Sequence, residues 1–375
     1  MVTRGPDEWT PPFGAQNPAY SLLQPLSSLP ALRHRPFAIA IAIGIGIESA
    51  FDAIFDSDSD PDSDSDRFSH TLVSYNVESV NNDWIPLQPG EPIGVVALSG
   101  PVDKDKLDAG LQILRGWGHP VIEASNLHRE ETYLAGGDED RLAGFEEVVA
   151  SGARVVVAAR GGYGASRLLD RIDWRDLSKR GICMVGFSDL TAILNPLAGN
   201  GVPQIHGPMV ASGLSTRYNT NRLHSVLLGE LRGGPLFRIP EGSVVRSGCA
   251  QGRALGGNLT VLTALIGTPW EPEFDGSVLF LEEVNEPLYR LDRMLTHLRG
   301  SDKLRNVKAL IGGSLRGCRP ASGRSDSWRR LLCEVAPPTA PVVVDLPFGH
   351  GAANLAFPIG VTVEIDTSAL QIIWK

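Results

Sequence analysis

A serine directly after an apolar run is the first residue whose surroundings suggest chemistry. Ser188 follows Gly186 and Phe187 at the end of the run 182–187. A serine on a sharp turn between a strand and a helix exposes its hydroxyl as a nucleophile, and the amide of the next residue, Asp189, can then face an oxyanion. Taken alone, however, a serine followed by an aspartate before a helix is more often an N-cap than a nucleophile. The nucleophile hypothesis therefore depends on a base and an acid elsewhere in the chain.

Two of the eight histidines follow apolar runs and are candidates for the base. His350 comes after the run 342–348, in a turn of small residues at 349–354 where its ring could project from the edge of a sheet. His206 also follows a short apolar run and precedes Gly207. A single histidine more often has a structural role than a catalytic one, so neither assignment stands without a partner.

Three glutamates are candidates for the acid that orients such a base. Glu282 and Glu283 end the apolar run 278–284, and Glu286 lies beside Pro287 where a helix is predicted to start. Side chains alternate along a strand, so Glu282 and Glu283 point to opposite faces and only one of them can face inward. The charge of Glu286 is explained by the helix terminus. The residues alone leave the choice between Glu282 and Glu283 open.

A second junction, Arg160-Gly161-Gly162-Tyr163-Gly164, follows another apolar run. Glycines there let the backbone turn tightly and approach a ligand. The loop lacks the Lys-Ser/Thr ending of a phosphate-binding loop, and its glycine spacing differs from the dinucleotide fingerprint. The chain has no HExxH motif, no compact His/Cys cluster and no CxxC pair, which argues against a metal site. No cofactor and no metal are therefore expected.

Short apolar runs alternate with helical periodicity from Ile93 onward. This alternation is typical of an α/β fold with a parallel sheet that helices cover on both faces. In the last third of the chain, strand-like runs become more frequent than helices, which predicts a mixed α+β region. The strand-like runs are 93–98, 121–124, 154–159 and 182–187 in the first region, and 278–284, 307–313, 342–348, 361–365 and 371–374 in the second.

These patterns divide the chain into four segments. The first segment mixes Pro, Ser, an isolated apolar run and the Asp/Ser tract 56–66, a composition that cannot bury enough apolar surface to fold. The predicted segments are a disordered extension at 1–88, an N-terminal nucleophile domain at 89–215, a connecting segment at 216–250 and a C-terminal domain at 251–375.

The charge and hydropathy of the chain exclude several kinds of partner. The formal net charge is -9, and the Asp/Ser tract supplies six of the aspartates. No Lys/Arg cluster is large enough to neutralise a run of phosphates, so no nucleic acid is expected as a partner. The apolar stretch 37–47 is shorter than the ~20 residues that span a bilayer, so no membrane segment is expected. The separated cysteines favour a cytoplasmic location, with export as the alternative if residues 33–53 act as a signal segment.

Six ordered segments, which cover most of the chain from Ile93 onward, resemble the LD-carboxypeptidase family of serine peptidases. That family includes muramoyltetrapeptide carboxypeptidases, which release the terminal D-alanine of murein tetrapeptides, and microcin C immunity peptidases, which hydrolyse peptide-nucleotides. The segments are RGGYGASRLLDRIDW (160–174), VGFSDLTAIL (185–194), IHGPM (205–209), GGNLTVL (256–262), LFLEEVNEPLYRLDRML (279–295) and GHGAANLAFPIG (349–360).

The resemblance implies a triad of Ser188, His350 and Glu282, and it thereby selects Glu282 over Glu283. It also implies a parallel-sheet nucleophile domain like that of class I glutamine amidotransferases, followed by a smaller mixed α+β domain, with the active site between the two and a homodimer as the assembly. The expected reaction is release of D-alanine from murein tetrapeptide in peptidoglycan recycling. A peptide-nucleotide substrate is the alternative, and a non-catalytic module that binds a carboxylate or a phosphate is the competing class of function.

The chemistry of such a triad suggests roles for the residues around it. The oxyanion is expected to bind the backbone amides of Asp189 and Gly162, and the planar guanidinium of Arg160 is a candidate for binding the carboxylate of the substrate. Further candidates for substrate binding are Gly161, Tyr163 and His206.

Overall fold

The computed structural model describes residues 84–318 and 327–375. These residues belong to one compact unit, Ser74–Lys375. The predicted extension lies outside the described residues except for positions 84–88, and so do the Asp/Ser tract and the candidate signal segment 33–53. In the part of the chain that the structure describes, no helix is both long and apolar enough to cross a membrane.

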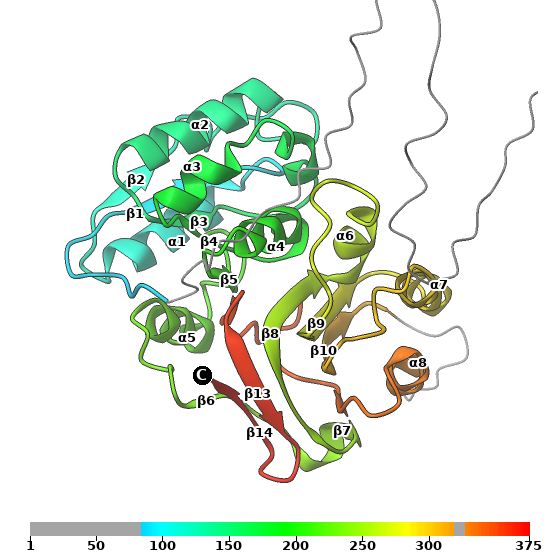
Figure 1. Ribbon diagram of the computed structural model, residues 1–375. Helices are drawn as coiled ribbons and strands as arrows, with labels where there is room; N and C mark the ends of the chain where they lie inside the picture. Colours follow the sequence, from blue (N-terminus) through cyan, green and yellow to red (C-terminus); the bar gives the residue numbers. More distant parts are fainter. Residues whose placement is uncertain (1–83, 319–326) are drawn as a thin grey trace, which may run out of the picture. The chain divides into compact units, whose positions relative to one another are not determined.

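The first sheet has six strands in the order β12-β5-β4-β3-β1-β2, and Figure 1 labels β1 to β5. Strands β1 to β5 run parallel, whereas β12 pairs antiparallel with β5. The four runs predicted as strands in the first region become β1 to β4, so the predicted parallel-sheet α/β architecture is confirmed. The strands are β1 (Ile93–Val96), β2 (Val121–Glu123), β3 (Val155–Ala158), β4 (Cys183–Gly186), β5 (Gln204–His206) and β12 (Phe357–Ile359), and the helices of this part are α1 (Lys104–Arg115), α2 (Asp138–Ala150), α3 (Trp174–Lys179), α4 (Thr191–Gly199) and α5 (Arg217–Leu227).

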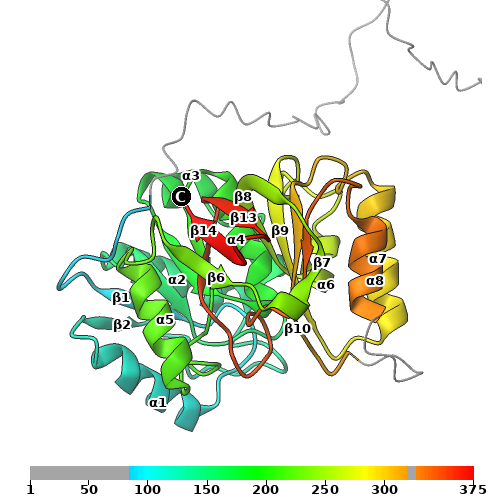
Figure 2. The ribbon, with the colours of Figure 1, turned by 90° about the horizontal axis from the view of Figure 1, so that it is seen from below.

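The second sheet has eight strands in the order β6-β14-β13-β8-β9-β10-β11-β7. It is mixed, as predicted, because β8 to β11 run parallel to their neighbours in that series while the remaining pairs are antiparallel. Helices α7 and α8 lie next to each other on one side of it (Figures 1 and 2). The elements are β6 (Pro235–Arg238), β7 (Val244–Arg246), β8 (Cys249–Asn258), α6 (Leu259–Ala264), β9 (Ser277–Val284), α7 (Leu288–Gly300), β10 (Ala309–Arg316), α8 (Ser327–Val335), β11 (Val342–Val343), β13 (Thr362–Asp366) and β14 (Gln371–Trp374).

The strands cross the segment boundaries that the sequence patterns suggest. Strands β6 and β7 lie within the predicted connecting segment 216–250, yet both belong to the second sheet. Strand β12 follows the His350 turn in the chain and pairs with β5 of the first sheet. The chain therefore returns to the first sheet a few residues after His350.

The two faces of β9 contribute to different cores. Leu279 and Leu281 pack with α7 and α8, whereas Phe280 belongs to the core that includes the first sheet. Because side chains alternate along a strand, Glu282 continues the face of Phe280, and Glu283 continues the face of Leu281. Packing on both sides of the sheet therefore decides which glutamate faces the first sheet.

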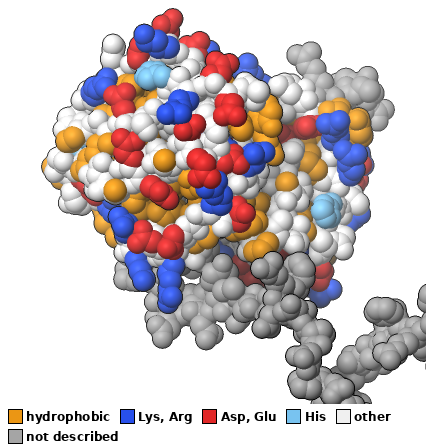
Figure 3. Space-filling view, turned by 90° about the horizontal axis from the view of Figure 1, so that it is seen from above, with side chains coloured by type: hydrophobic (Ala, Val, Ile, Leu, Met, Phe, Trp, Pro, Cys, Tyr) orange, Lys and Arg blue, Asp and Glu red, His pale blue; other side chains and the backbone are white. Residues whose placement is uncertain are grey.

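Charged side chains of both signs share the face of the molecule drawn in Figure 3. Lys and Arg side chains lie among Asp and Glu side chains there, with apolar side chains between them. This face does not present the extended basic surface with which proteins bind a run of phosphates.

Residues 84–88 pack against the described unit, although the sequence patterns place them at the end of the extension. Trp84 is 6% exposed, and its ring meets the ring of Trp374 edge-on, with centroids 5.3 Å apart. Leu87 is also buried, and its N–H donates to the carbonyl oxygen of Leu227 at 2.9 Å. The packed part of the chain therefore includes Trp84.

We expect Trp84→Ala to lower the free energy of unfolding by about 3 kcal/mol, because it removes a buried aromatic ring and leaves a cavity. Ile85→Ala is the matched control, since Ile85 is 54% exposed. Its truncation should cost less than about 0.5 kcal/mol. Urea denaturation followed by circular dichroism measures both variants, and equal costs for the two would contradict the packing of Trp84.

Candidate active site

Ser188 lies on a sharp turn between β4 and α4. Its φ of +62° is in the left-handed region, which residues with a side chain rarely adopt. The short 3-10 turn Ser188–Leu190 follows and leads directly into α4. A serine held in this strained conformation between a strand and a helix presents its hydroxyl away from the backbone, as in a nucleophile elbow.

His350 is held by the carboxylate of Glu282. Nδ1 of the His350 ring lies 2.6 Å from Oε2 of Glu282, and the backbone N–H of His350 donates to the same oxygen at 3.1 Å. The side chain of Glu282 is fully buried, whereas that of His350 is 17% exposed. Because the carboxylate accepts at Nδ1, this nitrogen carries the proton of the neutral ring, and Nε2 is left as an acceptor.

The accepting nitrogen of His350, Nε2, lies 3.0 Å from Oγ of Ser188. The structure thus brings Ser188, His350 and Glu282 together in one hydrogen-bonded series, although they are far apart in the chain. In this order a carboxylate orients an imidazole, and the imidazole can accept the proton of a hydroxyl. The arrangement is chemically suited to activating a serine for attack on a carbonyl carbon.

Gly349 lets the His350 turn lie directly against Glu282. Its φ is +91°, and a Cβ at this position would lie 2.5 Å from Oε2 of Glu282. Glycine alone combines this backbone conformation with so close an approach. The N–H of Gly349 donates to Oδ1 of Asn354 at 2.9 Å, which closes the turn.

The other two candidate acids have partners elsewhere. Glu283 accepts hydrogen bonds from Nδ2 of Asn258 at 2.9 Å and from the N–H and hydroxyl of Thr260 at 2.8 and 2.7 Å. Glu286 forms an ion pair with Arg290, one helical turn further along, at 3.1 Å. Glu283 therefore binds groups at the start of α6, and Glu286 binds a residue of the first turn of α7, whereas neither binds the imidazole of His350.

The carboxylate of Asp189 joins two loops, a role that the sequence patterns did not predict. Its Oδ2 accepts the hydroxyl of Ser99 at 2.6 Å and the N–H of Ala165 at 2.8 Å. Burial raises the pKa of the Asp189 carboxyl, while these two hydrogen bonds and the positive charge of Arg141 act in the opposite direction. No local signal pairs Ser99 with Asp189, because the two residues are 90 positions apart.

The glycine-rich loop packs directly against Ser188. A Cβ on Gly161 would lie 3.1 Å from Oγ of Ser188. Tyr163 projects from the loop and is 52% exposed. One guanidinium nitrogen of Arg160 donates to the carbonyl oxygen of Pro101 at 2.7 Å, which braces the loop. Gly161, Tyr163 and Arg160 therefore lie on the loop that borders the hydroxyl.

The structure places His206 in the core rather than at the open part of the site. Its side chain is 0% exposed, and its ring stacks on that of Phe357 with centroids 4.9 Å apart. Neither ring nitrogen has a hydrogen-bond partner among the described residues. Burial lowers the pKa of His206 to about 3, so the ring is neutral near pH 7. A side chain enclosed in this way does not touch a molecule bound at the surface.

A hollow of about 400 Å³ adjoins the His350 turn and has Ser314, Gly351 and Ala353 in its lining. A larger hollow, of about 710 Å³, lies beside Trp174 and Trp270 and has no triad candidate in its lining. In residues 84–318 and 327–375, no group of three or more His, Cys, Asp or Glu side chains is arranged to hold a metal ion. Neither hollow has Ser188, Glu282 or His350 in its lining, so neither marks the space in front of the Ser188 hydroxyl.

Two family models match the chain, and together they cover most of the described residues. The model of the LD-carboxypeptidase N-terminal domain matches residues 93–207, and that of the LD-carboxypeptidase C-terminal domain matches residues 251–365. The first match contains Ser188, and the second contains Glu282 and His350.

Individual proteins are also similar to this chain over most of its length. The murein tetrapeptide carboxypeptidase of Pseudomonas aeruginosa is 32% identical over 308 residues, which are 78% of this chain and 98% of that protein. The crystal structure of a muramoyltetrapeptide carboxypeptidase from Oxalobacter formigenes has a TM-score of 0.65 and 27% identity, and it covers 75% of this chain and 97% of its own. The microcin C7 self-immunity protein MccF of Escherichia coli, in its wild-type apo state, has a TM-score of 0.71 and 23% identity, with 77% of this chain and 97% of its own covered.

We expect His206→Phe to make the protein less sensitive to acid. The pKa of His206 is about 3 in the folded chain and about 6.5 in the unfolded chain, so the unfolded state binds the proton first as the pH falls. The contribution of the neutral ring to stability is therefore complete above pH ~6.5 and declines from there toward pH ~3, by about 1.4 kcal/mol per pH unit.

Urea denaturation at pH 7 and pH 5 measures this effect. Between these two values the free energy of unfolding should fall by about 2 kcal/mol more in the wild type than in His206→Phe. The other titrating groups are the same in both proteins, so the difference isolates position 206. An equal fall in the two proteins would contradict a neutral, buried imidazole.

Proposed function

Because this chain belongs to the LD-carboxypeptidase family of serine peptidases, we propose that it releases the terminal D-alanine from murein tetrapeptide. The hydrogen-bonded series of Glu282, His350 and Ser188 is the observation that carries this proposal. In it, the nucleophile comes from the predicted N-terminal domain, 89–215, and the base and the acid come from the predicted C-terminal domain, 251–375. No metal or organic cofactor takes part in the proposed chemistry.

The first half of the proposed reaction forms an acyl-enzyme. Oγ of Ser188 attacks the carbonyl carbon of the last amide bond, and its proton moves to Nε2 of His350, 3.0 Å away. Glu282 keeps the proton of His350 on Nδ1 and stabilises the imidazolium that forms. When the C–N bond breaks, His350 returns the proton to the amino group of the leaving D-alanine.

The second half releases the shortened peptide. A water molecule attacks the ester between the peptide and Ser188, and His350 takes up a proton from this water. The ester bond then breaks, and the proton passes from His350 to Oγ of Ser188. The triad returns to its starting protonation state, so each cycle consumes one water molecule.

Two backbone amides are proposed to bind the oxyanion. The amide of Asp189 is in the first turn of the helix that starts at Ser188, where N–H groups have no partner within the helix. The carbonyl oxygen of Gly161 accepts from the N–H of Gly100 at 3.2 Å, so the N–H of Gly162, at the other end of the same trans peptide, points away from Gly100. Each donor of this kind is typically worth about 3 kcal/mol in the transition state.

Arg160 is proposed to bind the terminal carboxylate of the substrate. A guanidinium carries five N–H donors in a planar fork that matches a carboxylate. The carbonyl oxygen of Pro101 accepts from one nitrogen only, Nη1, and this contact fixes the direction of the side chain. Tyr163, on the same loop, is exposed and is proposed to contact the substrate together with Gly161.

Sequence identity favours a murein peptide over a peptide-nucleotide as the substrate. The relative named for murein tetrapeptide is 32% identical to this chain, whereas MccF is 23% identical, a level at which similarity supports the fold alone. A peptide-nucleotide substrate is therefore an outcome of the test below rather than a second proposal.

We expect Ser188→Ala to lower the rate of D-alanine release from purified murein tetrapeptide by at least about 10⁴-fold, because the nucleophile is lost. Glu282→Gln should lower kcat by a similar factor of about 10⁴, since an amide no longer holds the imidazole in the required tautomer. Glu283→Gln is the matched control, because it makes the same chemical change on the opposite face of β9. It should keep kcat within several-fold of the wild type.

Other outcomes of these assays would assign a different nucleophile or a different function. Release of D-alanine by Ser188→Ala at the wild-type rate would show that another residue is the nucleophile. Hydrolysis of an aminoacyl-nucleotide, with no D-alanine released from the tetrapeptide, would assign the peptide-nucleotide reaction. No turnover of either substrate, together with no labelling of Ser188 by a fluorophosphonate, would indicate a binding module.

A further inference from the structure

Two buried, oppositely charged side chains fasten the glycine-rich loop to the loop that follows β1. The positive one is Arg141, on α2, and its side chain is 0% exposed. The negative one is Asp189, next to the nucleophile, and it is 4% exposed. Burying a charge is costly unless hydrogen bonds compensate for it, so a buried pair at this position calls for an explanation.

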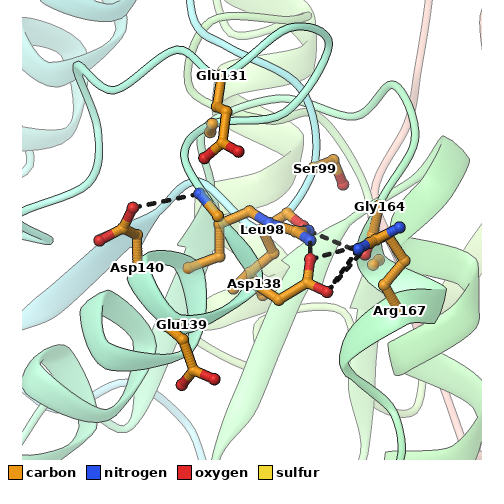
Figure 4. A network of polar contacts seen from close by, with 12 residues as sticks. Leu98, Ser99, Glu131, Asp138, Glu139, Asp140, Gly164 and Arg167 are labelled. Atoms are coloured by element: carbon orange, nitrogen blue, oxygen red, sulfur yellow. Dashed lines mark hydrogen bonds and ion pairs between the residues drawn. The ribbon is translucent and has the colours of Figure 1, made fainter.

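Arg141 bridges the two loops through their carbonyl oxygens. Its guanidinium nitrogen Nη1 donates to the carbonyl oxygen of Leu98, after β1, and to that of Gly164 at 2.9 Å. Its Nη2 donates to the carboxylate of Asp138, which also binds Arg167 at 2.8 Å (Figure 4). Arg141 therefore ties together two backbone segments, while Asp138 holds the guanidinium in position.

Asp189 bridges the same two loops one residue further along each of them. Its Oδ2 accepts the hydroxyl of Ser99 and the N–H of Ala165. Arg141 thus joins positions 98 and 164, and Asp189 joins positions 99 and 165. Two bridges side by side fix both the distance between the loops and their relative orientation.

The peptide group of Gly161 and Gly162 lies beside both Ser188 and the loop after β1, because a Cβ on Gly161 would lie 3.1 Å from Oγ of Ser188 and a Cβ on Gly162 would lie 3.4 Å from the backbone nitrogen of Gly100. A third contact, from the N–H of Gly100 to the oxygen of Gly161, sets the direction of this group. A shift of the loop after β1 would therefore turn the N–H of Gly162. Hydrogen-bond donors stabilise an oxyanion only when they are held in place before it forms.

We propose that Arg141 and the carboxylate of Asp189 are positioning residues, which hold the glycine-rich loop so that the N–H of Gly162 faces the developing oxyanion. This inference rests on the proposed function, because it assumes a reaction with an oxyanion. Neither side chain touches the substrate. The positive charge of Arg141 also offsets the negative charge of Asp189, which would otherwise oppose an oxyanion nearby.

The test compares Arg141→Met, Arg141→Lys and the wild type on murein tetrapeptide. We expect Arg141→Met to lower kcat about 100-fold with KM changed less than about 3-fold, because the lost interaction acts in the transition state. Arg141→Lys keeps the charge, but its single nitrogen cannot bind both loop carbonyls and the carboxylate of Asp138 with the geometry of the two guanidinium nitrogens, so kcat should fall about 10-fold. Circular dichroism and the melting temperature establish that each variant is folded.

The inhibition constant of a tripeptide aldehyde distinguishes the loss of an oxyanion contact from a general loss of structure. Addition of Ser188 to the aldehyde forms a tetrahedral oxyanion like that of the transition state, so its inhibition constant should rise by the same factor as kcat/KM falls. Arg167→Met is the matched control, because the side chain of Arg167 binds the same Asp138 without donating to either loop carbonyl, and the contact of its backbone N–H with Gly164 at 3.1 Å is kept in the variant. Its kcat and inhibition constant should stay at wild-type values.

The outcomes separate this inference from the proposed function. If the wild type releases no D-alanine, the proposed function is wrong. If the wild type is active and a folded Arg141 variant keeps the wild-type kcat, the positioning role is wrong. An unchanged inhibition constant in a slow variant, or an equal loss in Arg167→Met, would also overturn it. If Arg141→Met does not fold, Arg141→Lys decides by the same criteria.

Discussion

The contact between the buried carboxylate of Glu282 and the ring of His350 is the interaction on which the rest of the site depends. An ionised carboxylate without partners would be strongly unfavourable in this position, where its side chain is 0% exposed. Oε2 of Glu282 accepts both the backbone N–H and Nδ1 of His350, so one residue supplies two compensating donors. These two contacts fix the orientation of the imidazole ring, and in this orientation Nε2 faces Oγ of Ser188.

The fold keeps this contact in place by joining the two sheets close to it. Glu282 belongs to the face of β9 that packs toward the first sheet, because α7 and α8 cover the other face. Seven residues after His350 the chain enters β12, where Phe357 pairs with His206 of β5. The turn that bears His350 is therefore anchored to the second sheet at one end and to the first sheet at the other. Asp189 and Arg141 hold the two loops next to Ser188, which are the loop after β1 and the glycine-rich loop.

The local patterns in the sequence predicted the elements but not every contact. Short apolar runs were enough to place β1 to β4, and the residues at the end of the fourth run were enough to place the turn at Ser188. Alternation showed that Glu282 and Glu283 face opposite ways, yet the inward face depends on the helices that cover the sheet, which no local pattern reveals. Strand β12 is only three residues long and contains a proline, so it gives no strand signal of its own. The role of the Asp189 carboxylate depends on Ser99, which is distant in the chain.

Proton NMR of ¹⁵N-labelled protein tests the central contact most directly. If the buried carboxylate of Glu282 fixes the tautomer of His350, Nδ1 of the neutral ring carries a proton whose resonance lies far downfield of the amides. This resonance should move upfield in Glu282→Gln and stay in place in Glu283→Gln. A His350 ring with its proton on Nε2, or a resonance that does not shift in Glu282→Gln, would contradict this role of Glu282.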